Sequence, residues 1–403
     1  MQKGINYLIK KMNSILCLAA FLALFSFSST ITAEKFFNIK DYGAVAGDKG
    51  GATQALLKAW AEACATKGPT RVVIPHARYN LKQVVLAGPC QGHMTLQIKG
   101  TLVAPSNPKD IKADGWLKFT HLDGLTILNG TLDGQGKAAW TTQNCGTHAS
   151  CPNFPMNLRL DWVQNALIES LVSKDSKNFH INLISTVNVT LNHVTISAPG
   201  DSPNTDGIHL ARSSKVKILS TKIGTGDDCI SIGDGSQDIT VKGVTCGPGH
   251  GISIGSLGKF DNEAPVKGVR ISKCTLENTT NGIRIKSWPG MKKGAASDIH
   301  FTDINMKNVS FPVLIDQLYC PWGNCKSGTT SNVKISDVTF ENIHGTSATP
   351  TIVKLACSKH LPCENVNVNG VTVTYSGNLG PAKSECTNVQ AHITGRTESL
   401  RGC

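Results

Sequence analysis

Short runs in which apolar and polar residues alternate recur along the chain from about residue 120 to the C-terminus. In each run the apolar residues stand two positions apart, which is the period of a β-strand with one buried face. The runs are Val187–Leu191, Val216–Ile218, Ile239–Val241, Val269–Ile271, Ile299–Phe301, Val333–Ile335 and Val366–Val368. The pattern therefore predicts an all-β protein built from short strands.

These runs follow one another at a nearly regular distance, which we interpret as the length of one coil. The expected equivalent positions are Val189, Val216, Ile239, Val269, Ile299, Val333 and Val366. Their spacing falls within the period of roughly 20–50 positions that marks solenoids. Several strands per step without a helix are typical of a right-handed, single-stranded parallel β-helix, a solenoid.

Other repeat folds fit less well. A propeller would need about forty residues per blade, and leucine-rich repeats would need their Leu/Asn pattern. No Pro/Ser-rich linker is found, so we expect a single domain over residues 34–403.

One segment near the N-terminus has helical periodicity instead. Thr53 can act as its N-cap, and Ala55, Leu56, Ala59, Trp60 and Ala63 share one face. Because the ends of a solenoid expose strand edges and apolar surface, we expect this helix to cap the first coil.

The segment 1–33 has the layout of a secretory signal peptide. Lys3, Lys10 and Lys11 precede an apolar stretch from Ile15 to Phe27, and small residues lead to Ala33. The apolar stretch is short for a transmembrane span, although an uncleaved anchor is the alternative. We therefore expect a secreted, extracellular protein without a membrane anchor after cleavage.

Composition and charge agree with a folded domain that meets a polyanion. Apolar residues make up 40% of the 403 residues, and the formal charge is +12. Removing the three N-terminal lysines, with no acidic residue before Glu34, leaves +9 on the mature chain. A basic surface favours a polyanionic partner. Because the sequence contains no nucleic-acid-reading motif, we expect that this partner is not a nucleic acid.

Secretion makes the cysteines interpretable as disulfides. Spacing alone does not fix connectivity, but close neighbours in sequence suggest six pairs. They are Cys64–Cys90, Cys145–Cys151, Cys229–Cys246, Cys320–Cys325, Cys357–Cys363 and Cys386–Cys403. Cys274 is then left as a buried thiol. N-glycosylation sequons begin at Asn129, Asn188, Asn278 and Asn308.

Four acidic or basic residues recur at the spacing of the coils. Asp227 and Asp228 follow Asp206 after about one coil, and His250 follows Asp228 after about one more. Residues one coil apart stack at about 4.8 Å, so these side chains can line neighbouring coils of one face. Consecutive aspartates in a regular strand point to opposite faces, so both reach the cluster only where the glycine-rich segment bends.

Two cations stand one coil further on. Arg284 and Lys286 are two positions apart, which places both on the outer side of their strand, with Ile283 and Ile285 turned inward. Carboxylates beside fixed cations suit acid–base chemistry on a substrate that itself carries carboxylates.

Other interpretations of the single residues remain open at this point. Aspartates beside glycines are common in turns, a lone histidine is often structural, and exposed Arg and Lys on a strand are common. Adjacent aspartates can also hold calcium. The joint recurrence at coil spacing is what favours a catalytic site.

At these motifs the sequence resembles the polygalacturonases, pectin-cleaving glycoside hydrolases of family 28 with a right-handed parallel β-helix. The motifs are SPNTDGIH from Ser202, GTGDDCI from Gly224, GPGHGISIGS from Gly247 and NGIRIKS from Asn281, with IDQLYC from Ile315. The resemblance covers nearly the whole mature chain. It implies hydrolysis of α-1,4-galacturonosyl bonds with inversion, in organisation of the cell wall.

The resemblance also implies roles for particular residues. Asp227 would be the general acid, and Asp206 and Asp228 would activate the hydrolytic water. His250 would support the acid. Arg284 and Lys286 would bind the galacturonate carboxylate, with Asn204 and Tyr319 close to the sugar. Because clustered carboxylates raise one another's pKa, we expect one of the three to stay protonated and to serve as the acid.

The segments Asn144–Leu158 and Gly249–Asp261 look most like pollen-type exopolygalacturonases of plants, which favours exo action over an endo alternative. No cofactor and no metal are expected, and the partner is pectin bound by a monomer. Two further alternatives are a calcium-dependent pectate lyase, which shares the β-helix, and a non-catalytic solenoid that only binds pectin.

Overall fold

The computed structural model describes residues 2, 4, 5, 33–48, 51–141, 154–290, 292–323, 325, 326, 328–395 and 403. The chain divides into two units, Met1–Glu34 and Lys35–Cys403. The predicted signal peptide lies almost entirely outside the described residues, so its cleavage stays a prediction. No helix among the described residues is long and apolar enough to cross a membrane.

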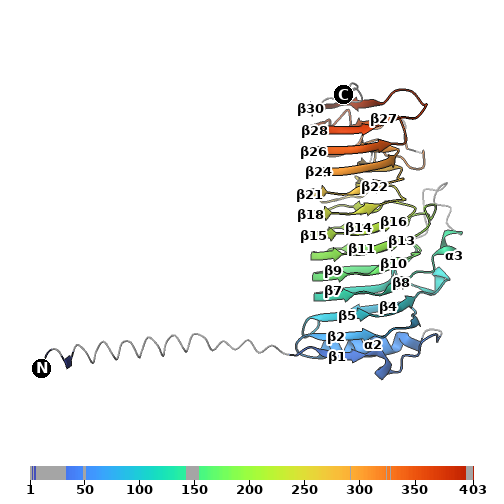
Figure 1. Ribbon diagram of the computed structural model, residues 1–403, viewed down its shortest axis with the longest axis vertical. Helices are drawn as coiled ribbons and strands as arrows, with labels where there is room; N and C mark the ends of the chain where they lie inside the picture. The colour runs from blue at the N-terminus through green and yellow to red at the C-terminus, as the bar shows by residue number, and fades with distance from the viewer. Residues whose placement is uncertain are drawn as a thin grey trace. The chain divides into compact units, whose positions relative to one another are not determined.

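The unit Lys35–Cys403 is a parallel β-helix, which confirms the predicted all-β fold (Figure 1). Its thirty described strands pair in parallel with the strands one coil before and one coil after. The pairs form three ladders, and the central coils pass through them in a fixed order. For example, β11, β12 and β13 occupy the first, second and third ladders, and β14 returns to the first.

The strands are grouped by ladder as follows. The first ladder contains β4 (Val84–Ala87), β11 (Ile181–Ile184), β14 (Ile208–Ala211), β17 (Ile230–Ile232), β20 (Ile252–Leu257), β23 (Asn281–Ser287), β25 (Phe311–Asp316), β27 (Thr351–Ala356) and β29 (Lys383–Thr387). The second contains β1 (Lys35–Asn38), β2 (Thr70–Ile74), β5 (Met94–Ile98), β12 (Val187–Asn192), β15 (Ser214–Leu219), β18 (Gln237–Lys242), β21 (Val266–Ser272) and β30 (Val389–Thr394). The third contains β3 (Arg78–Asn80), β6 (Thr101–Val103), β8 (Thr131–Asp133), β10 (Val172–Lys174), β13 (Thr195–Ser197), β16 (Lys222–Gly224), β19 (Thr245–Cys246) and β22 (Thr275–Glu277).

Five longer strands continue from one ladder into the next in the described part of the chain. They are β7 (Gly115–Leu128), β9 (Met156–Glu169), β24 (Lys293–Val309), β26 (Asn332–Ser347) and β28 (Cys363–Thr374). For example, β9 pairs with β11 in the first ladder and with β12 in the second.

Stacked aliphatic side chains fill the interior. On the first ladder the register aligns Ile181, Ile208, Ile230, Ile252 and Ile283, and all five are fully buried. The period-two alternation of the sequence produces this, because every second side chain points inward and meets its equivalent in the next coil. Fully burying each such side chain contributes roughly 1.5–3 kcal/mol.

The register confirms the predicted equivalent positions up to Ile299 and corrects one position after it. Ile299 lies opposite Val338, and Val338 lies opposite Val366, whereas Val333 lies opposite Gly294. The coil after Ile299 is therefore longer than predicted, and the next coil is shorter. The long coil contains the loop between β25 and β26, with the Cys320–Cys325 disulfide. Alternation changes phase within β26, because Ser336 and Asp337 separate the buried pair Val333 and Ile335 from the buried pair Val338 and Phe340. Each pair has the period of a strand, so sequence periodicity did not show which of them lies opposite Ile299.

The helix α2 (Gly51–Ala65) lies against the first strands, as predicted for a cap (Figure 1). Its buried face includes Leu56, Ala59 and Trp60. The prediction that Thr53 is the N-cap is wrong. Thr53 lies inside the helix and is buried, and its hydroxyl accepts a 2.9 Å hydrogen bond from the backbone N–H of Lys82.

Short helical turns at three further places complete the described fold. They are η1 (Ile39–Tyr42), η2 (Pro108–Asp110) and α3 (Lys137–Trp140).

Trp60→Ala tests the contribution of the cap. The indole is 4% exposed, packs edge-to-face on Phe119 at 5.6 Å, and donates to the Ala87 carbonyl. We expect its removal to lower the free energy of unfolding by about 3–5 kcal/mol, because the cavity forms at the end of the core. Thermal and denaturant unfolding followed by circular dichroism measure this. Trp162→Ala, where the indole is 60% exposed, is the control and should change little; equal effects would contradict the prediction.

Five of the six predicted disulfides are confirmed. They are Cys64–Cys90, Cys229–Cys246, Cys320–Cys325, Cys357–Cys363 and Cys386–Cys403. The sixth, Cys145–Cys151, lies outside the described residues. Cys274 is a buried free thiol, as predicted, and burial raises its pKa to about 11. A thiol in that state is a poor nucleophile.

Candidate active site

The turns that lead from the third ladder into the first carry the predicted acid–base residues. The register aligns Ile208, Ile230 and Ile252, so Asp206 and Asp228, each two positions earlier, take equivalent places on neighbouring coils. His250 takes the next place. The prediction that these side chains line neighbouring coils of one face is confirmed.

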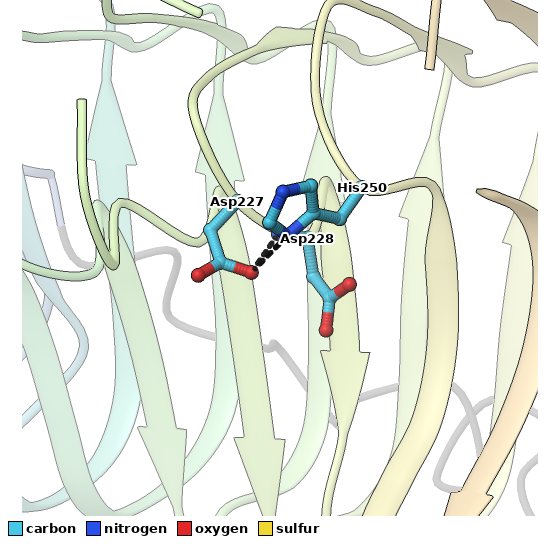
Figure 2. Close-up of side chains that lie close together, drawn as sticks. All are labelled: Asp227, Asp228 and His250. Carbon is cyan, nitrogen blue, oxygen red and sulfur yellow. Dashed lines mark hydrogen bonds and ion pairs between the residues drawn. The ribbon is translucent and has the colours of Figure 1, made fainter. Parts of the chain in front are cut away.

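Asp227 and Asp228 point to different partners, as Figure 2 shows. Asp227 faces His250, whereas the Asp228 carboxylate extends away from that pair. The turn that separates them needs Gly226, because a Cβ at that position would lie 2.0 Å from the Ser202 carbonyl oxygen. The predicted bend in the glycine-rich segment is therefore present, and it gives two adjacent aspartates two environments.

The Asp228 carboxylate is held by three donors from strands one and two coils further on. Arg284 Nη2 lies 2.7 Å from one oxygen, Lys286 Nζ lies 2.7 Å from the other, and the Ser253 hydroxyl donates at 2.9 Å. Asp228 is 1% exposed. Burial alone would raise its pKa, but Lys286 and Arg284 lower it to about 2. Asp228 is thus ionised throughout the mildly acidic range.

The two cations lie on the outer side of β23, with Ile283 and Ile285 buried beneath, as predicted. They are 7% and 6% exposed and form ion pairs with Asp228, a pairing that the sequence did not predict. Both cations are therefore paired with the Asp228 carboxylate before any substrate binds.

Asp227 and His250 form a second pair. Nδ1 of His250 lies 2.9 Å from Oδ1 of Asp227 (Figure 2). Burial alone would lower the pKa of His250, but the hydrogen bond and the charge of Asp227 outweigh it and raise the pKa above its ordinary value. One proton shared by this pair is consequently retained to higher pH than on an isolated imidazole.

Asp206 has a third environment. It is buried, and the Ser231 hydroxyl donates to its Oδ2 at 2.6 Å. Burial, followed by the charges of Asp227 and Asp228, raises its pKa well above the ordinary range. The sequence predicted that one of the three carboxyls stays protonated and serves as the acid, a role that the resemblance assigns to Asp227. The carboxyl whose pKa is raised is instead Asp206.

Sequence reasoning missed a chain of hydrogen bonds behind Asp206. Nδ1 of His209 lies 2.8 Å from the Ser231 hydroxyl. The single hydrogen of that hydroxyl is directed at Asp206 when Asp206 is ionised, so His209 donates from Nδ1. Burial lowers the pKa of His209 to about 4, so its imidazole is neutral above that pH. The signal was available, because His209 and Ser231 occupy outward positions in strands that follow the aspartates.

The remaining predicted residues line a hollow of about 390 Å³ in front of the cluster. Asn204 donates from its side chain to Asn178 at 2.7 Å and faces the hollow together with Asp227. Tyr319 also lines it, with Lys286 Nζ 5.0 Å from the ring centre. The structure therefore brings all the predicted site residues into one region, from several separate coils.

The cluster also contains a possible metal-binding group. One ligand atom each from Asp227, Asp228 and His250 lies within 4.8 Å of the others. Both oxygens of Asp228 already accept bonds from cationic side chains. Cation binding would compete with Arg284 and Lys286, so the absence of a metal stays a prediction.

A parallel β-helix whose hollow carries three neighbouring carboxyls in different environments has the groups that hydrolysis of a glycosidic bond requires. The model of the glycosyl hydrolases family 28 matches residues 64–397, and the chain belongs to that family. The resemblance noted in the sequence is thus confirmed.

Plant relatives match most of the chain. It is 48% identical over 363 residues to an exopolygalacturonase of Platanus acerifolia, covering 89% of this chain and 96% of the relative. It is 46% identical over 390 residues to a polygalacturonase of Gossypium hirsutum, covering 96% of each. A solved endo-xylogalacturonan hydrolase from Aspergillus tubingensis superimposes with a TM-score of 0.76 at 23% identity, covering 90% of this chain and all of that one. At that identity the structural likeness supports the fold alone.

Proposed function

We propose that this protein is a polygalacturonase, which hydrolyses α-1,4-galacturonosyl bonds of pectin with inversion and acts from the chain end. The observation that carries the proposal is the separation of three neighbouring carboxyls into three environments. Asp228 is fixed as an anion by two cations, Asp206 has a raised pKa, and Asp227 is paired with His250 at 2.9 Å. Inverting hydrolysis needs an acid and a base in the same site, and different environments supply them.

Asp227 is the general acid in this mechanism. Its carboxyl lines the hollow and is within hydrogen-bonding distance of His250. As the glycosidic bond breaks, the proton of the Asp227–His250 pair passes to the leaving oxygen. The raised pKa of His250 keeps that proton available at higher pH, and activity falls as the pH rises through that pKa.

Asp206 and Asp228 act on the water. Asp228 remains ionised and orients it, and Asp206 accepts the proton as the oxygen attacks the anomeric carbon. The raised pKa of Asp206 makes it a stronger base than an ordinary aspartate, provided that it is ionised. Activity is therefore lost as the pH falls through the pKa of Asp206.

Arg284 and Lys286 contact the uronate carboxylate at the cleavage position, with Asn204 and Tyr319 beside the sugar. Arg284 reaches both the hollow and Asp228, so its remaining N–H groups can donate to a substrate carboxylate. The ion pairs with Asp228 fix both cations before substrate binds, which reduces the ordering cost of binding.

Exo action is supported by the exopolygalacturonase relatives of Platanus acerifolia and Oenothera organensis. The test is the size of the products early in digestion of polygalacturonate. We expect galacturonate monomer from the start. A ladder of oligomers would assign endo action, unsaturated products that absorb in the ultraviolet would assign a lyase, and binding without new reducing ends would assign a non-catalytic solenoid.

Secretion to the cell wall and a monomeric state complete the proposal. The basic charge, +12 on the whole chain and +9 without residues 1–33, suits attraction to the pectic wall, which weakens as salt is added. The sequon residues Asn129, Asn188, Asn278 and Asn308 are exposed, so all four can carry glycans.

Ser231→Ala tests the hydrogen bond to Asp206. The Ser231 hydroxyl lowers the pKa of Asp206, so its removal raises that pKa further and leaves less of the ionised base at low pH. We expect the acid limb of the kcat/KM profile to move to higher pH, with kcat/KM on that limb falling roughly tenfold. The pH profile of kcat/KM is the measurement. Ser214→Ala on the second ladder is the control. An unchanged acid limb of the kcat/KM profile in the Ser231→Ala protein would show that the Ser231 hydroxyl does not affect Asp206.

A further inference from the structure

A group of aromatic rings lines a second hollow, of about 290 Å³, that also contains the carboxylates of the cluster. Trp288 lies 5.2 Å from Tyr319 and 5.2 Å from Trp322, measured between ring centres. Phe260 contributes a fourth ring and is 64% exposed. Asp206 and Asp228 line the same hollow, so the aromatic rings and the reacting groups face one space.

Lys259 lies among these rings. Its amino nitrogen is 5.5 Å from the ring centre of Phe260, 5.4 Å from that of Trp288 and 5.6 Å from that of Trp322. Cations at this distance are attracted to the negative ring faces. The rings therefore fix the amino group in place without neutralising its charge.

The backbone of the Lys259 segment is fixed independently. The Glu263 carboxylate accepts hydrogen bonds from the backbone N–H groups of Gly258, Lys259 and Phe260, at 2.6, 2.9 and 2.9 Å. This carboxylate is therefore already satisfied by backbone donors. A loop held in this way presents its lysine in one position, which lowers the entropy cost of binding an anion.

The charge of Lys259 differs from that of the other cations in the site. Arg284 and Lys286 form ion pairs with Asp228, whereas Lys259 forms no ion pair with any described residue. Asp234 also lines the hollow but makes no ion pair with Lys259. A positioned ammonium group without a counter-ion, in a hollow large enough for a sugar ring, is suited to bind a carboxylate.

We infer that Lys259 binds the carboxylate of a galacturonate unit next to the bond being cleaved, with Trp288, Trp322 and the exposed face of Phe260 around that unit. The inference rests on the proposed function for the identity of the substrate. It adds a uronate-binding position outside the Arg284–Lys286 pair, in the hollow formed by the Gly255–Glu263 and Tyr319–Trp322 segments. The ligand is recognised by its charge, so a methyl ester at that position should bind more weakly.

Binding of trigalacturonate to an inactive background tests the inference without depending on turnover. Asp227→Asn and Asp227→Asn/Lys259→Met are titrated with trigalacturonate, and the fluorescence of the tryptophans is followed, with calorimetry as a second measurement. We expect Lys259→Met to weaken binding roughly tenfold to a hundredfold, because a charge-assisted contact is lost, and Lys259→Arg to restore most of the affinity. The methyl-esterified trimer should bind weakly and equally to both proteins.

Lys292→Met is the matched control, because Lys292 forms a surface ion pair with Asp261 in the same region. It should bind the acidic trimer like its parent. An unchanged affinity in the Lys259→Met protein would overturn the inference. Equal losses for the acidic and the esterified trimer would also overturn it, because they would make Lys259 a link between two loops rather than a carboxylate ligand. If the wild-type protein fails to hydrolyse polygalacturonate, the proposed function fails, whereas the binding result still decides the role of Lys259.

Discussion

Asp227→Asn is expected to lower kcat on polygalacturonate by roughly 10²–10⁴-fold, because the amide cannot donate the proton that the leaving oxygen needs. The substitution keeps the size of the side chain, and an Asn side-chain oxygen can still accept the hydrogen bond from Nδ1 of His250 at 2.9 Å. KM should change little, since Asp227 acts in the transition state rather than in ground-state binding. Release of reducing ends under saturating substrate is the measurement.

The control for this variant lies in the same region of the chain. Asp201→Asn changes an exposed aspartate in the turn before β14 and should leave kcat unaltered. Circular dichroism of both variants must match that of the wild type. A folded Asp227→Asn protein with undiminished turnover would remove Asp227 from the role of the acid.

Asp228→Asn is expected to have the second large effect, on stability as well as on activity. The change leaves Arg284 and Lys286 buried without their counter-charge, and breaking a buried ion pair in this way costs about 3–5 kcal/mol. Activity should also be lost, because the anion that orients the water is gone. Thermal unfolding and the reducing-end assay measure the two effects separately.

A double variant separates the two causes. Asp228→Asn/Lys286→Met removes one of the stranded charges, so we expect part of the lost stability to return while activity stays absent. A single variant as stable as the wild type would show that the three-membered ion cluster does not stabilise the fold.

The wild-type protein should reveal the same cluster in its acid unfolding. The pKa of Asp228 is about 2 in the folded state, below the ordinary value of 3.8. A lowered carboxyl pKa stabilises the folded state fully above the ordinary value, and the contribution is lost as the pH falls from 3.8 through about 2. The Asp228→Asn protein should lack this part of the acid transition.

The features that could be predicted from sequence rest on local chemistry. Alternation with a period of two decides which side of a strand is buried, as for Ile283 against Arg284 and Ile285 against Lys286. Coil-length spacing then places Asp206, Asp228 and His250 on one face, because equivalent residues of neighbouring coils stack.

Other features depend on which residues of neighbouring coils pair with each other. The local pattern of apolar and polar residues does not contain that information. Val333 and Val338 belong to two separate alternating pairs of β26, and only the loop before β26 decides which of them lies opposite Ile299. Thr53 has the chemistry of an N-cap, but the backbone N–H of Lys82 lies close enough to use its hydroxyl inside the helix.

By itself, the sequence predicted the β-helix, the capping helix and the stacking of Asp206, Asp228 and His250 on one face, because each follows from periodicity or from coil spacing. It suggested the disulfide pairs that the described residues contain, although spacing alone does not fix them. Only the tertiary structure decided the electrostatic state of that set. The ion pairs of Asp228 and the His209–Ser231–Asp206 chain join residues that are far apart in sequence, as do the aromatic contacts of Lys259 with Trp288 and Trp322. The pKa of a buried group depends on such neighbours and on its distance from water, and both exist only once the coils are stacked.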